Sequence, residues 1–160
     1  DRPVMTILPN WVFDLRDRIP GLLEECSVGP PGWYRLCTQG DLLPPGPDAG
    51  LGFSCYSAKI MVQCGLWNEL TEDHRTQWIR HIQAFQRPPG SPGGGMFVDP
   101  WVESKARLRY AITCLRASRY KDLFRANWQN RWAETRQAVA TSSAIGSKPL
   151  YPITNFLSNP

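Results

Sequence analysis

Apolar residues recur every three or four positions in five stretches of the 160-residue chain, which is the period of an amphipathic helix. None of these stretches shows the strict apolar–polar alternation of a half-buried strand. The pattern therefore predicts an all-α fold, with residues 1–160 forming a single helical domain.

The first stretch, NWVFDLRDRI, predicts a helix with Asn10 as its N-cap, since a short polar side chain can accept a hydrogen bond from the first turn. Its expected buried face consists of Trp11, Leu15 and Ile19. Pro20 and Gly21 should stop or kink this helix. Residues 29–52 are rich in Pro and Gly and predict an irregular connection, a candidate rim or lid for a binding site.

A helical hairpin is expected next. The segment FSCYSAKIMVQCG predicts a helix that ends near Cys64, with Gly65 as a left-handed cap. Thr71 is the expected N-cap of the second helix, because two acidic residues follow it in the first turn. The expected buried faces are Phe53, Tyr56, Ile60 and Cys64 in the first helix, and Trp78, Ile82 and Phe85 in the second.

Proline and glycine then mark a joint between helices. The second helix should end near Gln86, because two prolines follow shortly after it, and three consecutive glycines at 93–95 let the chain reverse direction. Asp99 and Pro100 predict the N-cap and first position of a further helix over residues 100–118. The expected buried face of that helix is Trp101, Leu108, Ile112 and Leu115.

The order of these parts carries a family resemblance. A helix containing alanine ends in glycine, a second helix ends Ile-x-x-Phe-Gln, and a glycine-rich turn leads to Phe97. In this order residues 52–100 resemble a helical-hairpin repeat of the terpenoid cyclase and protein prenyltransferase type, and residues 131–152 are similar to the start of a further repeat. The resemblance implies an α/α toroid in which Gln86 and Phe97 tie successive helices together, as in squalene cyclases. Complete toroids are longer than 160 residues, so it also implies a partial ring or a fragment of a longer chain.

The motifs that would carry the chemistry of that family are missing. The sequence has no Asp-rich acid motif of the squalene cyclases, no DDxxD, and no Asp, Cys and His set spaced as the zinc ligands of protein prenyltransferases. A fold does not by itself deliver an activity. We therefore expect a binding or interaction module that lacks complete catalytic machinery, with no cofactor and no metal. The alternative is a chain that forms part of the cavity wall of an enzyme acting on an isoprenoid or carbohydrate substrate.

Several side chains could act as chemical groups. His74 and His81, the only histidines, lie seven residues apart on one side of a helix, and without a third ligand we interpret them as a solvated helix face. Asp99 and Glu103 form an i, i+4 carboxylate pair that could serve as acid and base, but a helix cap and a first-turn acid explain them better. Five tryptophans could line an isoprenoid cavity or stack on a sugar, yet core packing is the interpretation we favour for Trp67, Trp78, Trp101, Trp128 and Trp132.

A final helix is expected over residues 131–145, which carries Trp132 and Val139 and ends at Gly146. Within it Glu134 is the one weak catalytic candidate, because it could face a central cavity and protonate a substrate. An exposed helix face, or an ion pair with Arg131, is the alternative.

Charge is distributed unevenly along the chain. The stretch from 105 to 136 holds nine basic and two acidic residues, a net charge of +7, whereas the whole chain carries +4. At about 100° per residue, one stripe beside the apolar face of the helix expected over 100–118 predicts a surface for an anionic ligand or an acidic protein partner. That stripe consists of Lys105, Arg109 and Arg116. A solvated face is the alternative, and nucleic acid is not expected because no reading motif is present.

The five cysteines are irregularly separated and contain no CxxC motif, so neither a disulfide framework nor a zinc site is indicated. We interpret them as buried thiols in a reducing compartment and expect a cytoplasmic location. No apolar run approaches the roughly 20 residues that span a bilayer, so no membrane span is expected.

Overall fold

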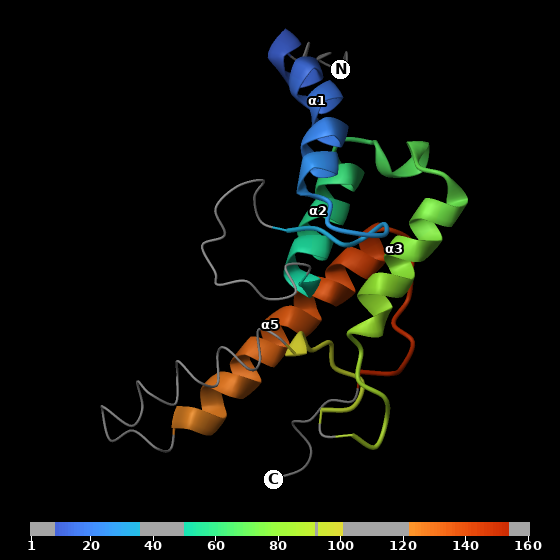
Figure 1. Ribbon diagram of the computed structural model, residues 1–160. Helices are drawn as coiled ribbons and strands as arrows, with labels where there is room; N and C mark the ends of the chain where they lie inside the picture. Colours follow the sequence, from blue (N-terminus) through green and yellow to red (C-terminus); the bar gives the residue numbers. More distant parts are fainter. Residues whose placement is uncertain (1–8, 36–49, 92, 101–121, 154–160) are drawn as a thin grey trace, which may run out of the picture.

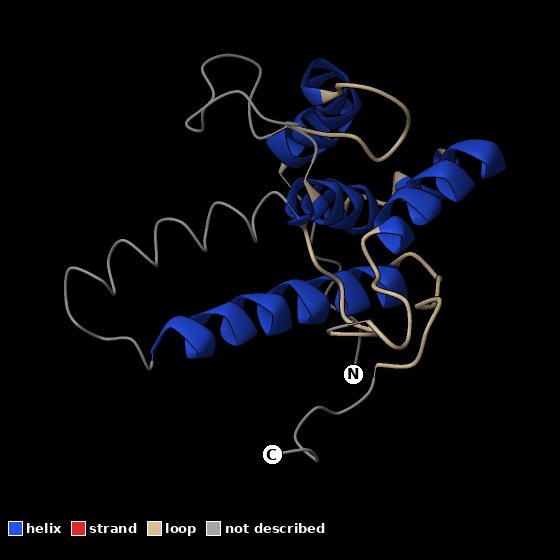
Figure 2. Ribbon diagram, turned by 60° about the horizontal axis from the view of Figure 1, so that its bottom comes forward, coloured by secondary structure: helices blue, strands red, loops and turns tan. Residues whose placement is uncertain are grey.

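The computed structural model describes residues 9–35, 50–91, 93–100 and 122–153, with the backbone alone for 122–130. Its elements are α1 (Asn10–Cys26), α2 (Leu51–Gln63), the 3-10 helix η1 (Trp67–Glu69), α3 (Glu72–Ala84) and α5 (Asp122–Ala144) (Figure 1). No strand is drawn in the described part of the chain (Figure 2). Its extended pairing is limited to two isolated β-bridges, Ser27–Tyr34 and Gln86–Phe97. This part of the chain is therefore helical, as expected, while the helix expected over 100–118 lies almost wholly outside it.

The expected hairpin forms from α2 and α3. Gly65 has a positive φ of 71° just after α2, so its left-handed conformation turns the chain toward η1. Thr71 caps α3 by accepting a hydrogen bond of 3.2 Å from the backbone N–H of His74. Trp78 in α3 donates from Nε1 to Ser54 Oγ in α2 at 3.0 Å. Both predicted caps are confirmed, and a buried polar contact joins the two helices.

The buried face of α2 differs from the one that its large residues predict. Tyr56 and Ile60 are exposed, whereas Ser54, Cys55 and Ala58 are buried. Helix α2 packs against α5, where Cys55 forms a hydrogen bond with Thr141, and the small residues Ala138, Thr141 and Ser142 of α5 are buried as well. Small side chains let two helix backbones approach closely, so packing rather than side-chain hydrophobicity selects this face.

Helix α1 also departs from expectation. Asn10 is its first helical residue and makes no cap, since the N-cap position is Pro9. The helix continues through Pro20 to Cys26. Ile19 is buried, and Leu23 and Cys26 pack against the core at the same helical spacing. Apolar burial on both sides of Pro20 thus outweighs the local cost of a proline in a helix, about 3 kcal/mol.

The Pro/Gly-rich joint after α3 is held by hydrogen bonds from one buried glutamine. Gln86 Nε2 donates to the carbonyls of Gly95 and Tyr151, each at 2.8 Å, and its Oε1 accepts from the Tyr151 N–H at 3.0 Å. Gly95 has a φ of 83°, and a Cβ there would lie 2.3 Å from the Pro152 carbonyl oxygen. Only glycine fits that position, which explains one of the three consecutive glycines. Gln86 thus ties the end of α3 to the turn and to the segment after α5.

Phe97 completes the joint. Its side chain is fully buried, and its N–H donates to Thr135 Oγ1 at 3.1 Å while the same hydroxyl donates to its carbonyl at 3.3 Å. The backbone before residue 100 is in this way fastened to the middle of α5.

Helix α5 begins nine residues before the expected start at 131. The sequence from 122 to 145 contains neither proline nor glycine, so no residue interrupts the helix there. It ends as expected, with Gly146 at a φ of 72° and the Ser147 N–H bonded to the Ser142 carbonyl at 2.8 Å.

Candidate functional site

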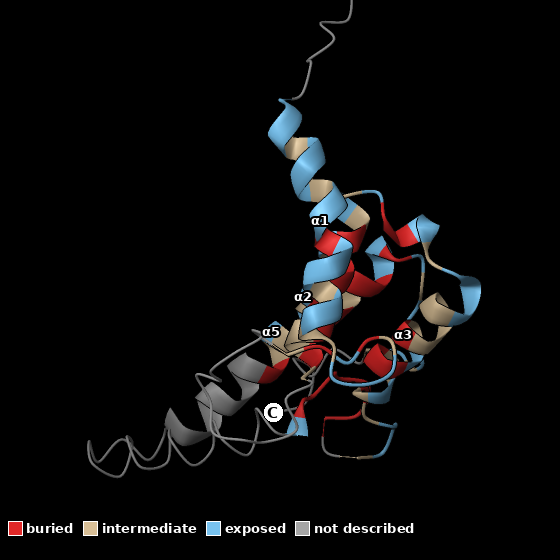
Figure 3. Cartoon of the chain, turned by 45° about the horizontal axis from the view of Figure 1, so that its top comes forward, coloured by how far each residue is buried: buried red, intermediate tan, exposed pale blue. Residues whose placement is uncertain are grey.

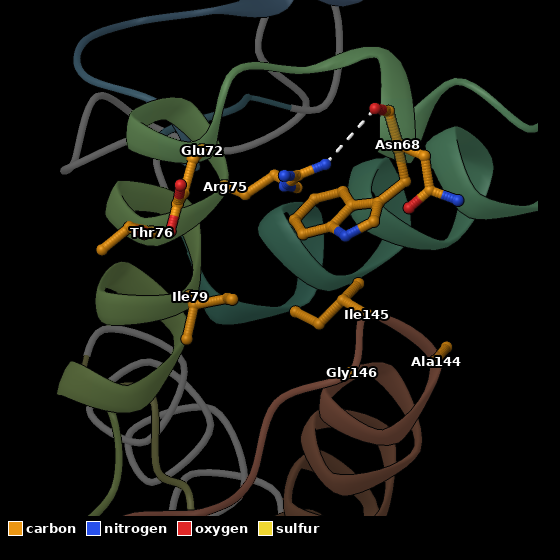
Figure 4. Close-up of a pocket in the computed structure, with 9 residues that line it drawn as sticks. Asn68, Glu72, Arg75, Thr76, Ile79, Ala144, Ile145 and Gly146 are labelled. Atoms are coloured by element: carbon orange, nitrogen blue, oxygen red, sulfur yellow. Dashed lines mark hydrogen bonds between the residues drawn. The ribbon is translucent and has the colours of Figure 1, made fainter.

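A groove of about 540 Å³ lies between η1, α3 and the end of α5 (Figure 4). Its apolar lining comes from Trp67, Ile79 and Ile145, which belong to three separate segments of the chain. The polar lining comes from Asn68, Glu72, Arg75 and Thr76, and the end of α5 closes one side. A volume of this size falls within the roughly 300–1,000 Å³ of small-ligand sites.

The floor of the groove is rigid because Trp67 belongs to the aromatic core. Its indole packs edge-on against Trp78 with ring centroids 5.3 Å apart, and Tyr34 lies on Trp78 at 4.8 Å. Trp67 and Trp78 are therefore core aromatics, as favoured from the sequence, and Trp67 also presents an edge to the groove. Trp132 is half-buried, and the side chains of Trp101 and Trp128 lie outside the described residues.

Arg75 supplies the positive charge of the groove. One of its terminal nitrogens donates to the Asn68 carbonyl at 3.3 Å, which holds the guanidinium between η1 and α3 (Figure 4). A guanidinium carries five N–H donors in a planar fork that matches a carboxylate. Glu72, one turn earlier on α3, adds a negative charge to the same lining. The groove therefore is lined mainly by polar groups, with a small apolar area and one charge of each sign.

Glu134, the weak catalytic candidate, has a structural contact. Its Oε2 accepts a hydrogen bond of 3.0 Å from the backbone N–H of Asp99. Asp99 is itself buried, and its Oδ2 accepts from the N–H of Leu51 at 2.9 Å. Asp99 therefore caps the start of α2. The helix over 100–118 that it was expected to cap lies almost wholly outside the described residues. Glu103, its proposed partner, lies outside the described residues.

The two histidines do not form one solvated face. His81 is buried, with its ring 4.9 Å from that of Trp33 and 5.2 Å from that of Phe85, whereas His74 is half-exposed. The reason is the loop before residue 36, which folds over α3. A Cβ on Gly32 would lie 3.0 Å from the Cβ of His81, so glycine is what allows the close approach. Sequence periodicity along α3 gives no sign of that loop.

Burial changes the acid–base chemistry of three core groups. It lowers the pKa of His81 from 6.5 to about 4, with the Asp99 carboxylate opposing the change. It raises the pKa of the Cys55 thiol to about 11, partly offset by a hydrogen bond with Thr141 and by Lys59. It raises the pKa of Tyr34 to about 12, and Glu24 adds to this. At neutral pH these three groups are therefore uncharged, and Cys55 is protonated and a poor nucleophile.

The basic stripe, a metal site and a membrane span are the remaining features considered from the sequence. Lys105, Arg109 and Arg116 lie outside the described residues, so the anionic surface stays a prediction. No three His, Cys, Asp or Glu side chains gather as a metal site in the ranges the structure describes. Among the helices described, none is long and apolar enough to cross a bilayer.

Comparisons with known proteins add no relative. No protein-family model matches the chain, and neither the curated proteins nor the solved structures gave a match. The toroid resemblance, with the tying role it implies for Gln86 and Phe97, therefore stays a prediction.

Sequence reasoning missed the groove. Its apolar lining comes from residues 67, 79 and 145, and no local pattern places them together. The sequence feature that could have pointed to the groove is Arg75, a basic residue one turn after the Thr71 cap of α3.

Proposed function

We propose that this chain is a binding or interaction module, a toroid-repeat-like domain whose ligand occupies the groove between α3 and the end of α5. The groove carries the proposal, because its rigid aromatic floor and opposed charges suit a short polypeptide segment with an apolar side chain next to a carboxylate. The apolar side chain would lie against Trp67 and Ile79, and Arg75 would bind the carboxylate.

We prefer this function to the cavity wall of an isoprenoid or carbohydrate enzyme. The acid expected to serve such an enzyme, Glu134, accepts the Asp99 N–H, and Cys55 is held as a neutral thiol. A cytoplasmic location belongs to the same proposal, and Cys26, Cys55 and Cys64 support it as free thiols.

The test is a peptide selection with a matched counter-selection. A random octapeptide library is first selected for binding to the wild-type chain. Peptides that also bind the Thr76→Trp variant, in which an indole fills the groove, are then removed. The selected peptides should carry an acidic residue beside an apolar one. When a selected peptide is titrated into the isotope-labelled chain, the backbone amide NMR signals of Ile79 and Ile145 should shift.

Two arginines on α3 provide the control. Arg75 lines the groove, whereas Arg80 is exposed elsewhere on the same helix. Arg75→Gln should raise Kd about tenfold, the cost of losing one charge-assisted hydrogen bond, and Arg80→Gln should leave it unchanged. Selection of the same peptides by wild type and Thr76→Trp, or equal loss in both arginine variants, would overturn the proposal.

A further inference from the structure

Helix α1 leaves part of its apolar face uncovered. Trp11 is 63% exposed, Leu15 48% and Leu22 45%. At 100° per residue these three side chains lie within about 40° of one another along the helix. We call them the α1 strip. Figures 1 and 3 show the first half of α1 extending away from the rest of the fold with mostly exposed residues.

The strip lies beside the face that anchors α1 to the core. Ile19 is buried, and Leu23 packs against the core on the same side. Arg16 Nε donates to the Cys64 carbonyl at 2.9 Å, and its guanidinium pairs with Glu69. These contacts fix the rotation of α1 about its axis, so the strip is held outward rather than being free to turn inward.

Charged residues border the outer edge of the strip. Asp14, Arg18 and Glu25 lie about 20–60° beyond Trp11 on the helical wheel, with signs that alternate along the axis. The ion pairs that the structure gives for α1 involve Arg16 alone, with Asp17 and Glu69. Asp14 and Arg18 thus stand one turn apart, each able to pair with a charge from outside.

The charge order selects one way of pairing with an identical helix. In a parallel two-fold pair, this charged edge would face the opposite edge of the partner's strip, where Ile19 and Leu23 lie, so Asp14 and Arg18 would meet apolar residues instead of charges. In an antiparallel pair centred near Arg16, Asp14 of each copy lies opposite Arg18 of the other, within one residue. The same register places Leu15 one residue from the two-fold axis and Trp11 within one residue of the partner's Leu22. Centring the pair on Arg18 would instead bring two guanidinium groups together.

We propose that the α1 strip binds a second copy of this chain through an antiparallel, two-fold pairing of α1 helices. The surface is self-complementary, as a two-fold interface requires, in both its apolar residues and its charges. This pairing goes beyond the groove and uses a different face of the molecule.

The size of α1 sets the strength of the dimer. Seventeen residues span about 25 Å, which is too short for the roughly 800 Å² per partner of a standard stable interface. The dimer is therefore weak, with a Kd of about 10–100 μM, and forms in a concentration-dependent equilibrium.

Sedimentation velocity over a concentration series tests the dimer. The wild-type chain should shift from monomer to dimer, and Leu15→Lys should raise Kd about tenfold or more, because it places a charge beside the two-fold axis. Tyr56→Lys is the matched control, since it adds the same charge at an exposed position on α2 and should leave Kd unchanged. A wild-type chain that stays monomeric to about ten times the expected Kd, or equal effects of the two lysines, would overturn the proposal.

Charge exchange tests the pairing itself. Asp14→Arg alone and Arg18→Asp alone should each weaken self-association, because each places like charges opposite one another twice. Mixing the two variants should restore dimers as heterodimers, and the double variant should dimerise like wild type. Failure of the mixture to recover association, with both variants folded by circular dichroism, would exclude the antiparallel register.

Discussion

Protonation of His81 should destabilise the fold at mildly acidic pH. The side chain is buried between Trp33 and Phe85, and its Nε2 has no hydrogen-bond partner in the described part of the chain. Burial lowers its pKa from 6.5 in an exposed histidine to about 4 in the fold. The charged group that acts on it is the Asp99 carboxylate, which favours the protonated ring but only partly opposes the effect of burial.

The sign follows from proton uptake. Between pH 6.5 and about 4 the unfolded chain binds a proton at residue 81 that the folded chain does not, so the free energy of unfolding falls as pH falls. One proton corresponds to about 1.4 kcal/mol per pH unit, which sets an upper bound of about 3 kcal/mol over this window. Above pH 6.5 the contribution is fully present, and below about 4 no further loss comes from this residue.

Urea denaturation between pH 7.5 and 4 measures the effect as a difference between variants, because exposed carboxylates titrate in the same range. His81→Leu removes the titrating group while keeping an apolar side chain, so its unfolding free energy should depend less steeply on pH, by up to one proton. His81→Gln is the second variant in case leucine packs poorly, and His74→Gln should retain the wild-type slope. Parallel pH curves for wild type and both variants at residue 81 would refute the reasoning.

Three further predictions concern single side chains and the basic stretch. Gln86→Ala should lower the free energy of unfolding by about 2–4 kcal/mol, because it removes three buried or half-buried hydrogen bonds. Gln83→Ala loses one exposed bond to the Lys148 carbonyl and should cost under about 1 kcal/mol in the same urea assay. Asp99→Ala should cost about 1–2 kcal/mol by removing the cap on α2, and loss of peptide binding without loss of stability would contradict that role. Heparin and pyrophosphate should bind the basic stripe of Lys105, Arg109 and Arg116 with an affinity that falls as the salt concentration rises. Replacing these three residues by glutamate should weaken that binding without unfolding the chain, and equal binding by wild type and variant would contradict the predicted surface.

Local sequence signals predicted the ends of the helices better than their faces. Gly65, Thr71 and Gly146 act where the pattern placed them, since a cap depends only on residues within one turn. Pro20 did not act as expected, because the packing of Ile19 and Leu23 depends on contacts that lie far away in the sequence.

Hydrophobicity predicted the buried face of α3, where Trp78 and Ile82 are buried, but not that of α2. Tyr56 and Ile60 look like core residues, yet they are exposed, because α2 packs against α5 on the side of Cys55, which contacts Thr141. His81 looked solvated and is buried, because a loop some fifty residues earlier in the sequence covers it. In each case the deciding neighbour is distant along the chain, and the period of a single helix carries no information about it.

The same long-range contacts determine the shape of the groove. Its two walls are α3 and the end of α5, and Gln83 and Gln86 near the end of α3 bond to the carbonyls of Lys148 and Tyr151, just after α5. Neither glutamine lines the groove, and both bonds join α3 or the residues just after it to the segment that follows α5. Gln83 makes an exposed hydrogen bond, whereas the bonds of Gln86 are buried or half-buried. Comparing Gln83→Ala with Gln86→Ala therefore distinguishes the loss of an exposed bond from the loss of the more buried bonds that join α3 to the segment after α5. If the Gln86 bonds hold α3 and the end of α5 together, Gln86→Ala should weaken binding of the peptides selected on the proposed groove more than Gln83→Ala does.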